Sequence, residues 1–285
     1  MKNQALWVYQ RVTANKRKEL MSNFRAAGKL PISILFYHRV ADDQPNDWTI
    51  SRRDFAMHLD WLQDRFEIVS LSEAQNRIIA NRSDRPTVAI TFDDGYADNS
   101  DFAIPELSRR QLPATYFVAT DYVREGKPFP HDVAAGSPLA PNTIDQLREY
   151  QSMGIEIGAH TRSHPDLGKI TEEQLLRDEI VGSIEDLSSW LDFSVRYFAF
   201  PYGMPNNTSQ RAVDLLQSQG ISGFCTAYGA YNWPSQNGFH LRRIHADPGL
   251  IRLQNWLTLD PRKLDEKYSL PFVEPQSCQQ LAPVS

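Results

Sequence analysis

The sequence predicts one α/β domain of the barrel type. Short apolar runs alternate with segments of helical periodicity along most of the chain, which is typical of a largely parallel sheet covered by helices. The length of 285 residues suits a single α/β barrel, since such domains run to roughly 250 residues. Hydrophobic residues make up 41% of the chain, which allows a large core and excludes a disordered or fibrous protein.

Seven apolar runs are expected to be strands, and four longer segments are expected to be helices. The strands are residues 32–37, 87–92, 114–118, 155–159, 197–200, 223–226 and 240–244. The helices begin near Arg52, cover 73–80 with Ser72 as N-cap, and span 172–191 and 207–220, the last ended by Gly220. Residues 124–142 are rich in proline and glycine and are expected to form a long irregular loop, which is more often functional than idle.

The chain is expected to have three parts: a basic helical segment over 1–30, the α/β domain over 31–260, and an extended tail over 261–285. Seven lysines and arginines face one glutamate in the first segment, a net charge of +6 (7 − 1) in a chain of net charge −5. This segment is either a solvated helix or a contact to an anionic membrane. The membrane interpretation uses the apolar residues Leu6, Trp7, Tyr9, Met21 and Phe24.

Several sequence features that would indicate secretion, membrane insertion or nucleic-acid binding are missing. The first residues contain no unbroken apolar run of a secretory signal, because Trp7 and Val8 are followed by Tyr9, Gln10 and Arg11. No stretch approaches the roughly 20 apolar residues of a membrane span. Two cysteines are too few for a disulfide framework, and the interspersed charges give no support for nucleic acid. We therefore expect a cytoplasmic protein, with membrane association as the alternative.

The strongest chemical signal is the pair Asp93-Asp94 after the run 87–92. The carboxyl ends of barrel strands form the active-site face, and the turn at Gly95 can direct both carboxylates into one pocket. Two carboxylates in different environments suit one metal ligand and one general base. An ordinary Asp-Gly turn is the competing interpretation.

His160 and His164 follow another predicted strand end. Two imidazoles four residues apart can bind one cation on the same face of a helical turn, although two polar loop histidines would look the same. Together with one aspartate they leave metal positions open, as catalysis needs. Pro201-Tyr202-Gly203 ends a third strand, and its backbone N–H groups are candidate oxyanion donors.

These motifs, in this order, resemble the polysaccharide deacetylase family, also called the NodB-homology or carbohydrate esterase family 4 domain, over roughly residues 30–250. The resemblance implies a distorted (β/α)7 barrel that removes acetyl groups from N-acetylated sugars with one divalent metal, most simply zinc. It assigns the role of base to Asp93 and the roles of metal ligands to Asp94, His160 and His164.

The chain departs from the family pattern in two places. The family's usual arginine before the Pro-Tyr-Gly turn, which orients the base, is Ala199 here. Arg196, Arg242 and Arg243 are the candidates to replace it. The general acid is either the early His38, as in the branch with poly-N-acetylglucosamine deacetylases, or the late His245. We favour His38, against the alternative of a histidine that is only hydrogen-bonded at a strand end.

The predicted function is removal of N-acetyl groups from a polysaccharide or glycolipid, with Tyr96, Tyr202 and Trp233 as candidate aromatic contacts to sugar. A metal-dependent hydrolase of a small amide or cyclic imide would use the same residues. A carbohydrate-binding protein that has lost catalysis is the third alternative, suggested by the missing arginine.

Overall fold

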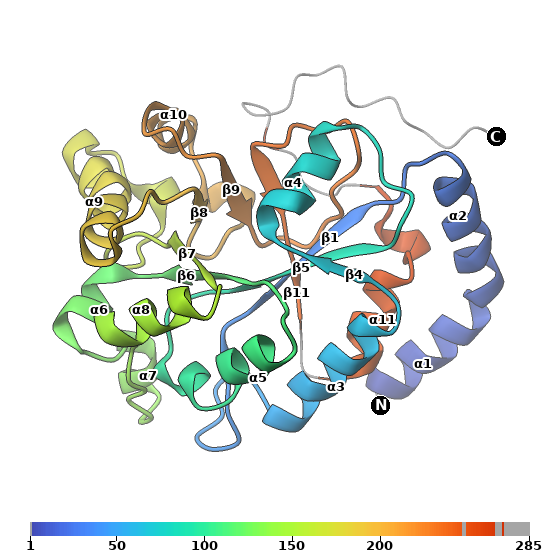
Figure 1. The fold of residues 1–285 in the computed structure, drawn as a ribbon, viewed down its shortest axis with the longest axis horizontal. Coiled ribbons are helices and arrows are strands. Elements are labelled where there is room, and N and C mark those ends of the chain that lie inside the picture. Colours follow the sequence, from blue (N-terminus) through green and yellow to red (C-terminus); the bar gives the residue numbers. More distant parts are fainter. Residues whose placement is uncertain (1, 247–248, 266–269, 271–285) are drawn as a thin grey trace.

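The computed structural model describes residues 2–246, 249–265 and 270. Its main sheet consists of β1 (Ile32–Tyr37), β4 (Glu67–Val69), β5 (Thr87–Phe92), β6 (Thr115–Val118), β7 (Glu156–Ala159), β8 (Tyr197–Ala199), β9 (Gly223–Thr226), β10 (His240–Arg242) and β11 (Ile244–His245). All pairings in it are parallel. The seven predicted strands are all present, and Figure 1 shows them surrounded by helices.

The sheet nearly closes into a barrel through the segment 240–245. β10 pairs with β9, and β11, which begins two residues later, pairs with β1. One interrupted strand therefore joins the two ends of the strand order, and the barrel has seven positions: β1, β5, β6, β7, β8, β9 and β10/β11. The predicted distorted (β/α)7 barrel is confirmed, and the distortion includes the break at Arg243.

Side chains alternate between the inside of the barrel and the surrounding helices, as the pleat of a strand requires. Inward positions such as Ile34, Ala89, Phe117 and Leu241 form one buried cluster. The outward positions join a larger cluster with the helices. Gly158 is one inward position where a side chain cannot fit, because a Cβ there would lie 2.5 Å from the Phe117 ring.

The helices of the barrel are α3 (Arg52–Gln63), α4 (Leu71–Ile79), α5 (Ala103–Arg109), α6 (Thr120–Glu125), α7 (Pro130–Ala134), α8 (Ile144–Ser152), α9 (Glu173–Leu191), α10 (Gln210–Ser218) and α11 (Leu250–Leu257). The predicted cap Ser72 is wrong: Ser70 caps α4, its Oγ accepting a hydrogen bond from the Glu73 N–H. The residues Leu71, Ala74 and Ile78 of this helix pack into the inward cluster.

The segment 124–142 is less irregular than predicted. It contains the end of α6, all of α7 and an isolated bridge between Tyr96 and Pro141. Short 3-10 helices lie at Ala97–Ser100, Leu167–Lys169, Pro205–Asn207 and Pro261–Lys263, and β2 (Arg39–Val40) pairs with β3 (Thr49–Ile50) beside the main sheet. Most of the predicted tail lies outside the described residues.

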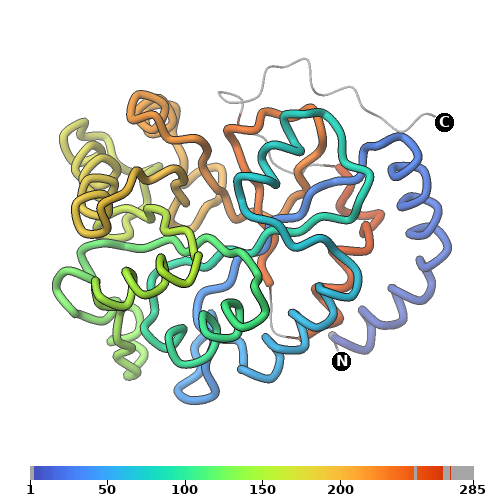
Figure 2. The backbone as a smooth tube through the Cα atoms, viewed as in Figure 1, coloured from blue at the N-terminus to red at the C-terminus, as the bar shows by residue number. Residues whose placement is uncertain are grey.

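The basic segment forms α1 (Lys2–Val12) and α2 (Ala14–Ala26), which lie against α11 at one side of the barrel (Figure 2). Arg17 is buried and donates hydrogen bonds to the Asn255 carbonyl and side chain at 2.7 and 2.8 Å. Met21 and Phe24, which the membrane interpretation used, pack against the core instead. Among the described residues no helix has the length and apolar character to cross a membrane.

Candidate active site

Asp93 lies at the carboxyl end of β5 and is held by Arg243. Its side chain continues the inward positions Ala89 and Thr91, and it is 3% exposed. The Arg243 guanidinium donates to both carboxylate oxygens, at 2.6 and 2.7 Å. Arg243 is itself fully buried inside the barrel, with its guanidinium 4.8 Å from the centre of the Phe36 ring. This bidentate, charge-assisted pair fixes the orientation of the Asp93 carboxylate.

Asp94 points to a different group of partners because its backbone leaves the strand. Its φ of 74° is left-handed, and the side chain lies beside His160 and His164. The Oδ1 atom of Asp94 is 3.4 Å from His160 Nε2 and 3.3 Å from His164 Nε2. One candidate ligand atom from each residue lies within 4.8 Å of the others. The two adjacent aspartates therefore have different partners: Arg243 for Asp93, and the two histidines for Asp94. Different surroundings are what two carboxylates need in order to play different chemical roles.

The donor set fits a divalent metal. The Nδ1 atom of His160 lies 2.7 Å from the Ala199 carbonyl oxygen, so a hydrogen on Nδ1 leaves the Nε2 lone pair free for a cation. Within the described part of the chain, the Asp94 Oδ1 atom is buried without a hydrogen-bond partner. A buried carboxylate oxygen without a donor is costly unless a cation completes it. One carboxylate and two imidazoles are typical of a catalytic zinc site with open positions.

The electrostatics keep both carboxylates ionised. Burial by itself would raise the pKa of Asp93, but the charge and hydrogen bonds of Arg243, together with the nearby His160 and His38, outweigh burial and the pKa is lowered. Burial would also raise the pKa of Asp94, but its contacts to His160 and His164 hold that pKa well below the usual range. Both carboxylates are therefore anionic in the folded protein.

The loop that carries the two histidines has a strained backbone, and hydrogen bonds to helix α9 hold it in place. Thr161 and His164 both have left-handed backbones, with φ of 67° and 59°. Glu179 on α9 accepts hydrogen bonds from the backbone N–H groups of Arg162 and Ser163 at 3.0 and 2.9 Å, and from the Ser163 hydroxyl at 2.5 Å. These bonds offset the cost of a left-handed backbone at two non-glycine residues.

Asp186 on the same helix holds the side chain that projects from this loop. It accepts hydrogen bonds from the Arg162 guanidinium at 2.9 and 3.1 Å and from the Thr120 hydroxyl at 2.9 Å. Gly182, between Glu179 and Asp186 on the helix, leaves room for that guanidinium, since a Cβ there would lie 2.3 Å from it. The face of α9 is therefore shaped to fit the ligand loop.

His38 and His245 lie together at the carboxyl ends of β1 and β11. Their ring centres are 5.8 Å apart, and the Phe36 ring stacks on His245 at 4.9 Å. The Nδ1 atom of His38 is buried without a hydrogen-bond partner among the described residues. Burial lowers the pKa of His38 to about 4, although the nearby Asp94 and Asp93 carboxylates act in the opposite direction. His38 is therefore neutral at pH 7 in the free protein.

The other predicted residues are placed as follows. Arg196 pairs at the surface with Glu156, and the buried Arg242 donates a hydrogen bond to Gln236, so Arg243 alone of the three candidates contacts Asp93. Trp233 packs on Phe24, 5.0 Å between ring centres, where the N-terminal helices meet the barrel.

The predicted aromatic contacts differ sharply in exposure. Tyr96 is fully buried, with its hydroxyl donating to Asp132 at 2.9 Å, so its ring offers no face to a sugar. Pro201 is buried in the turn after β8, and Tyr202 is 60% exposed with its ring 5.2 Å from that of His164. The left-handed φ of 60° at Tyr202 makes the turn sharp.

Sequence reasoning missed three residues that support the site. Glu179 and Asn99 carry no motif, and Asn99 is recognisable only from its contacts: its amide donates to the His38 carbonyl at 2.7 Å and accepts from the Val40 N–H at 3.0 Å. The third is Trp48, whose ring lies 4.8 Å from His38 and 5.7 Å from His245. The Asp-Trp sequence at 47–48 carries no signal of its own.

Comparison with known proteins identifies the family. The polysaccharide deacetylase family model matches residues 80–232. The chain is 28% identical over 226 residues to the protein named "Putative polysaccharide deacetylase YxkH" of Bacillus subtilis (strain 168), with 78% of this chain and 73% of that protein covered. It is 23% identical over 223 residues to the poly-beta-1,6-N-acetyl-D-glucosamine N-deacetylase of Staphylococcus aureus (strain MRSA252), with 75% and 73% covered.

A solved structure supports the same family assignment. The structure of IcaB from Ammonifex degensii superposes with a TM-score of 0.68 and 25% identity, covering 80% of this chain and 97% of that one. The chain therefore belongs to the polysaccharide deacetylase family, with relatives in the branch that deacetylates poly-N-acetylglucosamine.

Proposed function

We propose that this protein is a metal-dependent N-deacetylase of an N-acetylated sugar polymer. The observation that carries the proposal is the pairing of two adjacent carboxylates with different partners: Asp93 with Arg243, and Asp94 with His160 and His164. A base beside a three-residue metal site is what hydrolysis of an acetamide requires. The similarity to a poly-beta-1,6-N-acetyl-D-glucosamine N-deacetylase points to the same type of substrate.

In the proposed reaction Asp94, His160 and His164 hold one divalent ion, most simply zinc. When bound, this ion supplies Lewis-acid chemistry that polarises the acetyl carbonyl and acidifies water. Asp93 accepts the proton of the attacking water, with Arg243 keeping its carboxylate in place. The Tyr202 backbone N–H donates to the oxygen on which negative charge develops.

His38 protonates the leaving sugar amine in this proposal, with His245 beside it. Since His38 is neutral in the free protein, it must gain its proton during the cycle rather than hold it beforehand. That proton is the one that Asp93 takes from the attacking water. It passes from Asp93 to His38, and from His38 to the amine nitrogen as the carbon–nitrogen bond breaks, so both side chains return to their starting charge.

The non-catalytic alternative rested on the absence of an arginine at Ala199. Arg243 reaches Asp93 from the interrupted strand, which argues against that alternative. A small-amide hydrolase would use the same residues, and substrate comparison separates the two.

The test is acetate release from β-1,6-linked N-acetylglucosamine oligomers, alongside small amides, by protein stripped with a chelator and then given zinc. We expect zinc to restore activity on the oligomers, and we expect His164→Ala to lose stoichiometric zinc as measured by metal analysis. Activity only on small amides, or full zinc content in His164→Ala, would refute the proposal.

A further inference from the structure

Two exposed aromatic rings border the candidate active site. Only eight large hydrophobic side chains of the described residues are classed as exposed, and Trp48 (44%) and Tyr202 (60%) are two of them. Trp48 lies against His38 and His245, whereas Tyr202 lies against His164. Both rings thus combine an open face with direct contact to residues of the site.

The rings stand on opposite sides of the barrel mouth. Trp48 precedes β3 in the segment that follows β1, and Tyr202 follows β8. In the seven-position barrel, β5, β6 and β7 separate β1 from β8 on one side, and β9 and β10/β11 separate them on the other. The site residues Asp93, Asp94 and His160 end strands β5 and β7, so they lie between the two rings.

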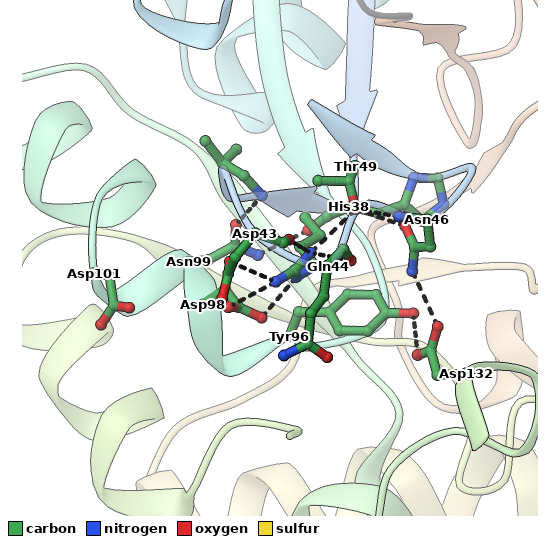
Figure 3. A network of polar contacts seen from close by, with 12 residues as sticks. His38, Asp43, Gln44, Asn46, Thr49, Tyr96, Asp98, Asn99, Asp101 and Asp132 are labelled. Carbon is green, nitrogen blue, oxygen red and sulfur yellow. Dashed lines mark hydrogen bonds and ion pairs between the residues drawn. The ribbon is translucent and has the colours of Figure 1, made fainter. Parts of the chain in front are cut away.

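The segment that carries Trp48 is held in place by polar contacts, several of which Figure 3 shows. Asn46 accepts a hydrogen bond from the Trp48 backbone N–H at 3.0 Å and donates one to Asp132 at 3.0 Å. Asp132 is buried and also accepts from the Tyr96 hydroxyl. The segment after β1 is therefore tied to Asp132 of α7 and, through Asp132, to Tyr96, which lies two residues after Asp94.

A second anchor lies beneath the same segment. Arg39 is fully buried and donates to both carboxylate oxygens of Asp98 at 2.7 and 3.0 Å. It also donates to the backbone carbonyls of Asp43 and Gln44 at 2.8 and 2.9 Å. The backbone on both sides of Asn46 is therefore held in place, and the Trp48 ring rests on His38 and His245. Positioning an aromatic residue in advance lowers the entropic cost of binding a ligand.

We propose that Trp48 is a binding residue for a sugar ring adjacent to the one that loses its acetyl group, and that Tyr202 supports the neighbour on the other side. This inference rests on the proposed function and deepens it. A pyranose ring presents an apolar face of C–H groups that packs on an aromatic ring, while its hydroxyls stay in water. The site then takes an internal sugar of a chain, with a neighbour on each aromatic ring.

The experiment measures kcat and KM by acetate release from β-1,6-linked N-acetylglucosamine oligomers of one to six sugars. For Trp48→Ala we expect KM for the pentamer to rise about tenfold, which corresponds to about 1.4 kcal/mol, with the monomer almost unaffected. Tyr202→Ala should act in the same direction. Trp7→Ala removes a tryptophan of similar exposure on α1, 48% exposed, and should match the unaltered protein.

Two outcomes overturn the inference. In the first, Trp48→Ala has the same KM for the pentamer as the unaltered protein. In the second, Trp48→Ala lowers kcat by the same factor for the monomer and the pentamer, which would mean that the ring acts only through His38. Failure of the proposed function looks different, because the unaltered protein then releases no acetate from any oligomer. In that case titration of tryptophan fluorescence with the pentamer still tests the binding role of Trp48.

Discussion

The two halves of the candidate active site are built in different ways. The ligand half carries Asp94, which follows β5, and His160 and His164, which both follow β7, so two short sequence motifs supply all three residues. The closing half carries His38, His245 and Arg243, which come from the first strand and the last strands of the sheet. Motif residues define the first half, whereas barrel closure assembles the second.

The two halves also differ in the partners of their buried carboxylates. In the ligand half the Asp94 Oδ1 atom has no hydrogen-bond donor among the described residues, and Glu179 on α9 holds the loop that carries the two histidines. In the closing half the Asp93–Arg243 pair is complete within the protein. One half therefore leaves an oxygen that a cation would satisfy, whereas the other half is completed by a pairing between segments distant in the sequence.

Arg243→Met tests the closing half and has the largest expected effect. It leaves the Asp93 carboxylate buried without its partner, and breaking a buried pair from one side costs about 3–5 kcal/mol. We expect that loss in the free energy of unfolding in urea, together with a large loss of acetate release. Arg196→Met removes the more exposed pair with Glu156 and should cost about 1 kcal/mol or less. Equal effects of the two substitutions would contradict the comparison.

The pH dependence of stability tests the packing behind β1. His58 is fully buried against Tyr37, its Nδ1 3.2 Å from the Tyr37 hydroxyl, and burial lowers the pKa of His58 to about 4 from 6.5. Between these values the unfolded chain binds a proton that the folded protein does not, so stability falls as pH falls from 6.5 to 4. The loss attributable to His58 is at most about 3 kcal/mol.

His58→Gln isolates this contribution, because glutamine can still pair with the Tyr37 hydroxyl but does not titrate. We expect the difference in unfolding free energy between pH 7 and pH 4 to be smaller in this variant by up to that amount. An unchanged pH profile would show that His58 is protonated normally in the folded protein.

Glu179→Gln tests the ligand half and has the smallest expected effect of the three. The amide keeps the shape but weakens the acceptor for the backbone N–H groups of Arg162 and Ser163, which loosens the loop before His164. Residues that orient metal ligands typically change affinity by about 10–100-fold, and we expect a zinc affinity lower by roughly tenfold in chelator competition. Glu185→Gln, an exposed position on the same helix, is the control and should keep full affinity.

Local signals account for what could be predicted of the fold. Each of the seven strands was visible as an apolar run, because strands inside an α/β barrel are buried on both faces. Helix ends were less certain: Ser70 and Ser72 are equally good caps by type, and only the packing of Leu71 into the barrel decides between them. The basic charge of residues 1–30 could not reveal that Arg17 is buried against α11.

The sequence by itself determined the family and the grouping of Asp93, Asp94, His160 and His164, because these residues follow strand ends that a parallel barrel must bring to one face. Only the tertiary structure decided which arginine orients Asp93. Arg196, Arg242 and Arg243 look alike in sequence, but the pleat and the break between β10 and β11 point Arg243 alone into the barrel at the level of Asp93. Trp48 likewise gained its place beside His38 only when the segment after β1 folded over Arg39.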